Sequence, residues 1–190
     1  MRINALTVLI ALGLAAFLPA VFGTQEEAAA PQLPVTVFAL RHAETVESTK
    51  TARDPELSYQ GKVRAARLAT LLGKTGVTHL YSSPYIRTKA TLAPLAEALK
   101  LKVVELDPRK ANSYTEAIAA LPPGSVVVVC GHSNTIPGLV KALGGEATNL
   151  EGHPQYGPML AHDSYDRMFQ VTLPGVEGAA VSTIELRLGE

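Results

Sequence analysis

Residues 35–45 read Val-Thr-Val-Phe-Ala-Leu-Arg-His-Ala-Glu-Thr, an apolar, β-branched run that ends in a polar segment containing His42. Such a run is typical of a central strand that is buried on both faces of a parallel sheet. The chain repeats this design at 126–134, where Val-Val-Val-Val-Cys is followed by Gly-His-Ser-Asn and the histidine is His132. Because ligands bind at the carboxyl ends of the strands in open α/β sheets, the two histidines are predicted to meet at one site.

A third polar segment places an arginine at the same edge of the predicted sheet. It reads Ser-Ser-Pro-Tyr-Ile-Arg at 82–87 and follows another strand-like run, so that Arg87 joins Arg41 beside the histidines. A guanidinium group stays charged and presents a planar fork to phosphate, and a neutral imidazole is a competent nucleophile toward phosphorus. Asn134 opens the helix after His132, whose free N–H groups also favour an anion. These residue types predict a phosphate pocket that contains its own nucleophile.

Strands and helices alternate along the rest of the chain, which predicts a three-layer α/β/α fold with a mainly parallel central sheet. We expect helix caps at Ser58, Ser83 and Ser113, the second with Pro84 at the first helical position. Residues 146–166 are expected to form a long loop, and loops of that length are usually functional or mobile. The expected elements are strands at 35–40, 77–81, 101–106 and 126–130, a closing pair of strands at 167–173 and 181–188, and helices at 59–72, 84–99, 113–121 and 136–143.

The first 34 residues differ in composition from the rest. Arg2 precedes an apolar stretch at 6–18, as in a secretory signal peptide that we place at 1–23. We assign 24–34 to a linker and 35–190 to the folded domain. The apolar stretch is shorter than the roughly 20 residues that a membrane span needs. Export to the periplasm or the medium is therefore predicted, without stable membrane insertion after cleavage; an uncleaved amino-terminal anchor is the alternative.

Charge and cysteine content narrow the possible functions. The chain has 17 Lys+Arg and 17 Asp+Glu, a balance that gives no electrostatic reason for nucleic acid binding. Its single cysteine, Cys130, cannot form an internal disulfide. A metal site built from His42, His132 and Asp163 is an alternative, but the chain lacks the short-range ligand pairs of such sites, and neighbouring arginines would repel a cation. No cofactor and no metal are predicted.

Three motifs stand in the order Arg-His-Ala-Glu-Thr at 41–45, Ser-Ser-Pro-x-x-Arg-Thr at 82–88 and Gly-His-Ser at 131–133. Together they resemble the motifs of the histidine phosphatase superfamily, also called phosphoglycerate mutase-like. The resemblance extends over residues 35–188 and implies a phosphoglycerate mutase-like fold, a small phosphorylated substrate and metal-independent hydrolysis. By this resemblance His42 is the phosphorylated nucleophile, and the rest of the phosphate pocket is formed by Arg41, Arg87 and His132.

The general acid that protonates the leaving group does not follow from these motifs. Many family members carry a glutamate between the second and third motifs; the candidates here are Glu116, then Asp107, then Asp163. In lacking a clear acid the chain also resembles phosphohistidine phosphatases, whose imidazole leaving group depends less on protonation. The main prediction is an exported phosphomonoesterase. A phosphohistidine phosphatase and a non-catalytic module that binds phosphorylated ligands are the alternatives.

Overall fold

The computed structural model describes residues 32–48, 53–110, 112–176 and 178–189. The predicted signal peptide at 1–23 lies outside these residues, and so does the predicted linker up to residue 31. Within the described ranges, no helix is both long and apolar enough to cross a membrane.

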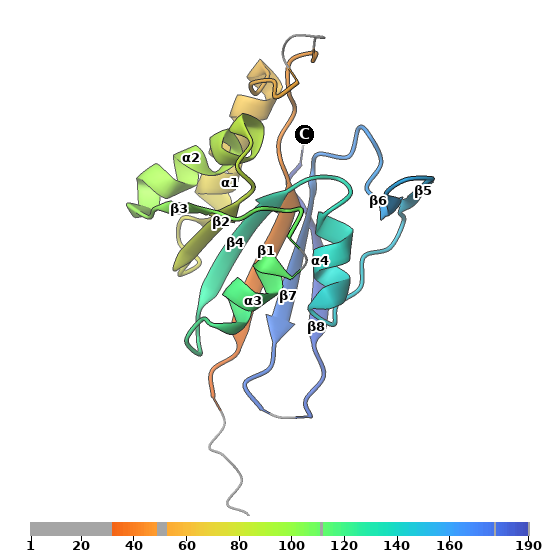
Figure 1. Cartoon of the computed structure of the whole chain (residues 1–190). Coiled ribbons are helices and arrows are strands. Elements are labelled where there is room, and N and C mark those ends of the chain that lie inside the picture. The colour runs from red at the N-terminus through yellow and green to blue at the C-terminus, as the bar shows by residue number, and fades with distance from the viewer. Residues whose placement is uncertain (1–31, 49–52, 111, 177, 190) are drawn as a thin grey trace, which may run out of the picture. The chain divides into compact units, whose positions relative to one another are not determined.

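Among the described residues, six strands form one sheet in the order β3-β2-β4-β1-β7-β8 (Figure 1). The four strands from β3 to β1 run parallel, whereas β7 runs antiparallel to β1, and β8 antiparallel to β7. This confirms the mainly parallel sheet and the closing strand pair. The bounds are β1 Val35–Arg41, β2 His79–Ser82, β3 Val103–Glu105, β4 Val126–Gly131, β7 Arg167–Leu173 and β8 Ser182–Arg187.

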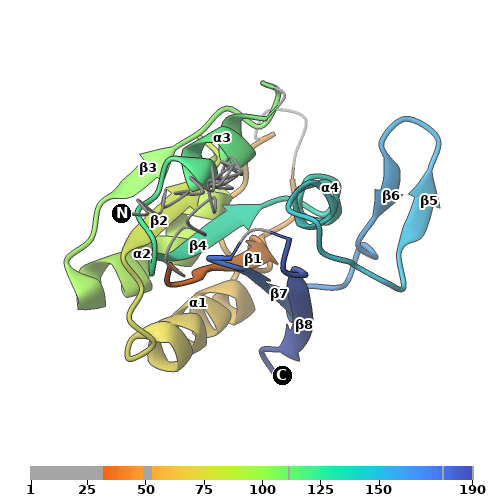
Figure 2. The same ribbon diagram turned by 90° about the horizontal axis from the view of Figure 1, so that it is seen from below.

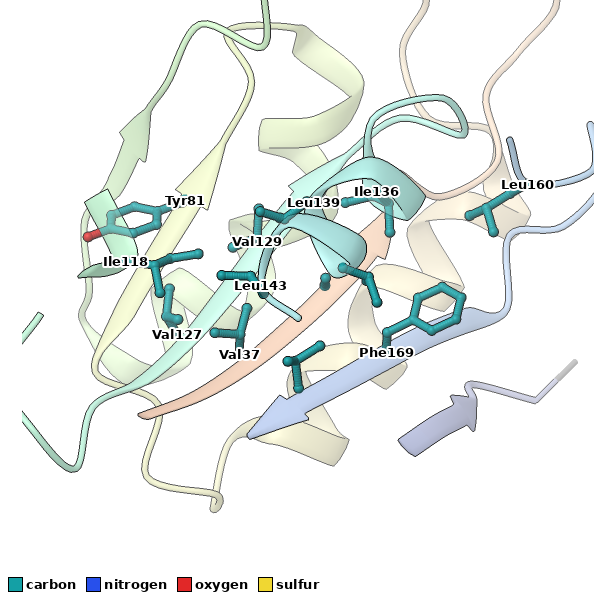
Figure 3. Close-up of a cluster of buried hydrophobic side chains, with 13 residues drawn as sticks. Val37, Tyr81, Ile118, Val127, Val129, Ile136, Leu139, Leu143, Leu160 and Phe169 are labelled. Atoms are coloured by element: carbon teal, nitrogen blue, oxygen red, sulfur yellow. The ribbon is translucent and has the colours of Figure 1, made fainter. Parts of the chain in front are cut away.

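In the described part of the chain, two helices cover each face of the sheet, which confirms the three-layer fold (Figure 2). Alternate residues of β1 face opposite layers: Phe38 and Leu40 pack toward α1 and α2, whereas Val37 and Ala39 pack toward α3 and α4. Figure 3 shows the cluster of buried apolar side chains that includes Val37. The helices are α1 Tyr59–Leu72, α2 Ile86–Leu99, α3 Ser113–Ala119 and α4 Ile136–Ala142.

One of the three predicted helix caps is confirmed and two are wrong. Ser58 caps α1, because its side chain accepts a hydrogen bond from the Gly61 N–H. Helix α2 begins at Ile86, after Tyr85, since the side chain of Ser83 is bound to other side chains of the site. The side chain of Ser113 donates to the Asp107 carbonyl, and the residue before it, Asn112, takes the cap position.

The predicted loop at 146–166 contains a small hairpin of its own. Strands β5 (Glu151–His153) and β6 (Gly157–Met159) pair antiparallel, apart from the main sheet. Beyond the hairpin, the backbone returns to the sheet edge, where Leu160 N–H donates to the Ser133 carbonyl. The predicted strand at 101–106 is also shorter than expected, because the edge strand β3 pairs only with β2.

Glycine at position 61 is required by close backbone contact, and this gives a first prediction. A Cβ on Gly61 would lie 2.0 Å from the Glu44 carbonyl oxygen, whereas a Cβ on Gly138 of α4 would meet nothing within 4 Å. We expect Gly61→Ala to lower the free energy of unfolding by about 2 kcal/mol or more, as overpacking does. Gly138→Ala, the matched control, is expected to raise it by up to about 1 kcal/mol, because alanine favours helix. Urea unfolding measures both, and equal effects of the two variants would refute the contact argument.

Candidate active site

The three polar segments lie close together because the strands that precede them are neighbours in the sheet. Strand β4 lies between β2 and β1, and Arg41 stands opposite Gly131 in the register, so His42 and His132 emerge side by side. The centroids of the two imidazole rings lie 5.5 Å apart, at an interplanar angle of 66°. The structure therefore brings the two predicted histidines together at the carboxyl edge of the sheet.

His42 is buried and its tautomer is defined. Its Nδ1 lies 2.8 Å from the carbonyl oxygen of Ala43. Since a carbonyl oxygen can only accept a hydrogen bond, Nδ1 carries the hydrogen and Nε2 keeps its lone pair. Burial, with smaller contributions from the charges of Arg41 and Arg87, lowers the pKa of His42 from 6.5 to about 3. At neutral pH the ring is thus an uncharged nucleophile with Nε2 available.

His132 is held by two side chains. Its Nε2 lies 2.9 Å from the hydroxyl oxygen of Ser83, and its Nδ1 lies 3.3 Å from a terminal nitrogen of Arg87. The ring of Tyr85 packs edge-on against the imidazole at 4.9 Å between centroids. Burial, then the positive charges of Arg87 and Arg41, lower the pKa of His132 to about 4, although the carboxylate of Asp54 opposes this. His132 is therefore also uncharged at neutral pH.

Arg41 is a buried cation whose described hydrogen bonds go to backbone carbonyls. One terminal nitrogen donates to the carbonyls of Ala161 and His162, at 3.1 and 2.8 Å, and the guanidinium lies 4.1 Å from the ring centroid of Tyr165. Its Nε is buried without a hydrogen-bond partner among the described residues. Burial lowers the pKa of Arg41. Because a buried polar group without a partner costs free energy, the pocket favours an anion that accepts from this guanidinium.

Arg87 is oriented by a carboxylate that the sequence analysis missed. Asp54 accepts from one terminal nitrogen of Arg87 at 2.9 Å and from the backbone N–H of Ile86 at 2.8 Å. The guanidinium also lies 4.5 Å from the ring centroid of Tyr85. No motif spacing could have revealed Asp54, since it lies in a stretch without periodicity, 33 residues before Arg87.

The three candidate acids occupy different places. Glu116 lies exposed in the first turn of α3, and within the described residues its side chain makes no hydrogen bond or ion pair. Asp107 is paired with Arg109, whose bonds lower the pKa of the Asp107 carboxyl. Asp163 is exposed, but its charge acts on Arg41 and opposes the lowering of that pKa. Of the three carboxylates, Asp163 is the one whose charge acts on Arg41.

Asn134, predicted to bind substrate, lies at the edge of a neighbouring cavity. This cavity has a volume of about 1000 Å³ and is bordered by α4, the β5–β6 hairpin and β8. Within the described part of the chain, no hydrogen bond joins the Asn134 side chain to the two histidines or to the two arginines. The structure therefore groups His42, His132, Arg41 and Arg87, and leaves Asn134 beside this group.

The donor set of the site suits an oxyanion better than a metal ion. Among residues 32–48, 53–110, 112–176 and 178–189, no three His, Cys, Asp or Glu side chains cluster as a metal site requires. The predicted alternative of a metal held by His42, His132 and Asp163 thus lacks a ligand cluster. Two guanidinium groups beside two imidazoles instead match the charge and geometry of a phosphoryl group.

The lowered pKa values of the histidines predict a loss of stability in acid. Both folded pKa values lie below the ordinary value of 6.5, so below pH 6.5 the unfolded chain binds protons that the folded chain does not. Stability is then complete above that pH and falls as the pH drops, with a slope of up to about 1.4 kcal/mol per pH unit for each histidine.

Urea unfolding between pH 7 and about pH 5 measures this slope. We expect His42→Gln and His132→Gln each to make it shallower, because each removes one titrating group. His153→Gln, in the exposed β5 strand, is the control and is expected to leave the slope as it is. Slopes that are identical in all four proteins would contradict the assignment.

Known proteins are similar to this chain in sequence and in fold. Residues 37–109 match the model of the histidine phosphatase superfamily, branch 1. A stretch of 77 residues is 38% identical to phosphoserine phosphatase 1 of Hydrogenobacter thermophilus, and this match covers 38% of the chain and 36% of that protein. The chain thus spans about a third of the length of this relative.

Solved structures extend the likeness to most of the chain. The protein histidine phosphatase SixA, in complex with tungstate, superposes with a TM-score of 0.58 at 18% identity, over 80% of this chain and 97% of that one. Phosphoglycerate mutase from Bacillus anthracis superposes with a TM-score of 0.57 at 15% identity, over 82% of this chain and 93% of that one. The fold is phosphoglycerate mutase-like, and residues 37–109 are similar in sequence to the histidine phosphatase superfamily.

Proposed function

We propose that the protein is a metal-independent phosphatase that hydrolyses phosphomonoesters through a phosphohistidine on His42. The observation that carries this proposal is the pairing of two uncharged imidazoles, 5.5 Å apart, with two guanidinium groups at one sheet edge. The match of residues 37–109 to the superfamily model and the partial likeness to a phosphoserine phosphatase support it.

The geometry suggests how each group acts. Nε2 of His42 attacks phosphorus, the N–P bond forms and the bond to the leaving oxygen breaks, and this oxygen takes a proton from the substrate monoanion or from solvent. Arg41 and Arg87 bind the non-bridging oxygens and stabilise the charge that develops on them. Water then attacks the phosphohistidine, the N–P bond breaks, and inorganic phosphate leaves. The Ala43 carbonyl keeps Nδ1 of His42 protonated throughout, so that Nε2 is the atom that reacts.

A phosphohistidine phosphatase is the second candidate, and one observation favours it. Within the described residues, none of the three candidate acids makes a hydrogen bond to the histidines or arginines of the site, so the geometry identifies no general acid for an alkoxide leaving group. An imidazole leaves more readily once its ring is protonated. The similarity to SixA, a protein histidine phosphatase, also favours this candidate, and it is a similarity of fold alone.

A substrate panel distinguishes these candidates. The purified domain is assayed with an aryl phosphate, phosphoserine, a phosphoglycerate and a phosphohistidine peptide, each with and without chelator. The proposal predicts turnover of monoesters unaffected by chelator, together with an acid-labile, base-stable phosphoryl group on the protein. Turnover of the phosphohistidine peptide alone would favour the second candidate. Binding of phosphate without turnover of any substrate would identify a binding module and refute both.

We also propose that the protein is exported, on the composition of residues 1–23. Arg2, the apolar stretch at 6–18 and the small residues Ala20 and Gly23 are typical of a signal peptide. Expression of the full chain in bacteria, followed by fractionation and amino-terminal sequencing, tests this proposal. A periplasmic or secreted protein that begins near residue 24 is expected. An unprocessed protein in the cytoplasm would contradict it.

A further inference from the structure

A chain of hydrogen bonds runs through the site behind His132. It begins at Arg87, whose terminal nitrogen lies 3.3 Å from Nδ1 of His132. It continues from Nε2 of His132 to the hydroxyl of Ser83 at 2.9 Å, and from there to the hydroxyl of Thr88 at 2.8 Å. It ends where the Thr88 hydroxyl meets the carbonyl oxygens of Ser83 and Tyr85, both at 2.9 Å. Both hydroxyl residues are fully buried.

The two ends of this chain determine the direction of every bond in it. A guanidinium can only donate, so Nδ1 of His132 accepts and the ring hydrogen lies on Nε2. A carbonyl oxygen can only accept, so Thr88 donates its hydrogen there and receives that of Ser83. Ser83 is then left to accept from Nε2. The arguments from Arg87 and from Thr88 are independent, and both put the hydrogen of His132 on Nε2.

We infer that Ser83 and Thr88 are positioning residues that hold His132 as its Nε2–H tautomer and so leave Nδ1 as the nitrogen that takes up a proton and donates it to a bound phosphate. This inference rests on the proposed function. Its consequence follows from the charges near His132, which are the positive charges of Arg41 and Arg87 and the negative charge of Asp54; His42, its neighbour, is uncharged. In the empty pocket the arginines keep Nδ1 unprotonated.

A bound phosphate changes this balance at Nδ1. It takes over hydrogen bonds from Arg87 and adds negative charge, so Nδ1 gains a proton from solvent or from the monoanionic substrate. The protonated Nδ1 then donates a hydrogen bond to a phosphoryl oxygen, while Nε2 keeps its bond to Ser83. In the other tautomer Nδ1 would carry the hydrogen in the empty pocket, facing the N–H groups of Arg87, and Ser83 would lose its donor.

Nitrogen NMR of the histidine rings tests this directly in the absence of turnover. The His132 signals are assigned by their loss in His132→Gln. In the wild-type protein we expect a protonated Nε2 and an unprotonated Nδ1, and with saturating inorganic phosphate a hydrogen on both nitrogens. Ser83→Ala and Thr88→Val are each expected to give a mixture of tautomers and to lower kcat by about tenfold or more, with a smaller change in KM.

Thr88→Ser keeps the hydroxyl and is expected to restore both the tautomer and kcat. Ser82→Ala is the matched control: it removes an equally buried hydroxyl from the neighbouring residue, one that donates to the Ser83 carbonyl and makes no described bond to His132. It is expected to leave the tautomer and kcat unchanged. A thermal melt of each variant shows whether it folds.

The outcomes separate this inference from the proposed function. A wild-type His132 with its hydrogen on Nδ1 would overturn the inference even in an active phosphatase, and so would an unchanged tautomer in folded Ser83→Ala and Thr88→Val. The expected tautomer pattern in a protein that hydrolyses no phosphate ester or phosphohistidine would support the hydrogen-bond chain and overturn the function.

Discussion

His42→Ala is expected to abolish phosphatase turnover, with a loss in kcat of at least about 10⁴-fold, because it removes the atom that bonds to phosphorus. The fold should persist. The described hydrogen bond of the His42 side chain goes to the carbonyl of the next residue, and the apolar clusters on the two faces of the sheet do not include this ring. Steady-state kinetics with an aryl phosphate, and a test for an acid-labile phosphoryl group, measure the loss.

The control for this variant is His79→Ala. His79 lies at the start of β2 and is hydrogen-bonded to the hydroxyl of Thr78. We expect this variant to keep its turnover and its phosphohistidine. Turnover retained in His42→Ala would rule out the phosphohistidine mechanism, whereas equal losses in both variants would point to a general effect on folding.

Arg41→Gln is expected to lower kcat/KM by about 10²- to 10³-fold, the usual effect of losing one well-placed donor to a transition-state oxyanion. The variant should also lose the thermal stabilisation by inorganic phosphate that the wild-type protein is expected to show, since a ligand stabilises the state that binds it. Arg41→Lys should recover only part of either effect, because an ammonium group keeps the charge but not the planar fork.

The control for these variants is Arg67→Gln, which removes an exposed arginine of α1. Neither kcat/KM nor the stabilisation by phosphate should change in it. Thermal melts with and without phosphate, together with kinetics, provide both readouts. If phosphate stabilised Arg41→Gln as strongly as the wild-type protein, Arg41 would not bind the phosphoryl group, and its buried guanidinium would need another explanation.

The architecture could be predicted from the sequence because it follows from local patterns. Apolar runs such as 35–40 and 126–130 indicate strands buried on both faces, and their alternation with amphipathic segments implies a layered parallel sheet. Because each histidine directly follows one of these runs, His42 and His132 could be predicted to lie at the carboxyl edge of the sheet. The cap of helix α1 could also be predicted, since Ser58 and Gly61 are only three residues apart in the sequence.

The two wrong helix caps show where local reasoning ends. A serine before a helix is a good cap only if its hydroxyl is free, and the hydroxyl of Ser83 is bound to His132, 49 residues later. The same limit applies to the acid. Glu116 was chosen from its place between two motifs, yet it lies exposed on α3, whereas Asp163 lies where its charge reaches Arg41.

The residue types at the carboxyl edge of the sheet could be predicted from the sequence: two histidines and Arg41 directly after buried strands, and Arg87 in the first turn of α2. How these side chains are held there depends on contacts that form only in the folded chain. Asp54 orients Arg87, the carbonyls of Ala161 and His162 hold Arg41 across 120 and 121 residues, and the hydroxyls of Ser83 and Thr88 lie behind His132. The difference is one of distance along the sequence. Strand burial follows from neighbouring residues, whereas hydrogen-bond partners and buried charges depend on residues that meet only when the chain has folded.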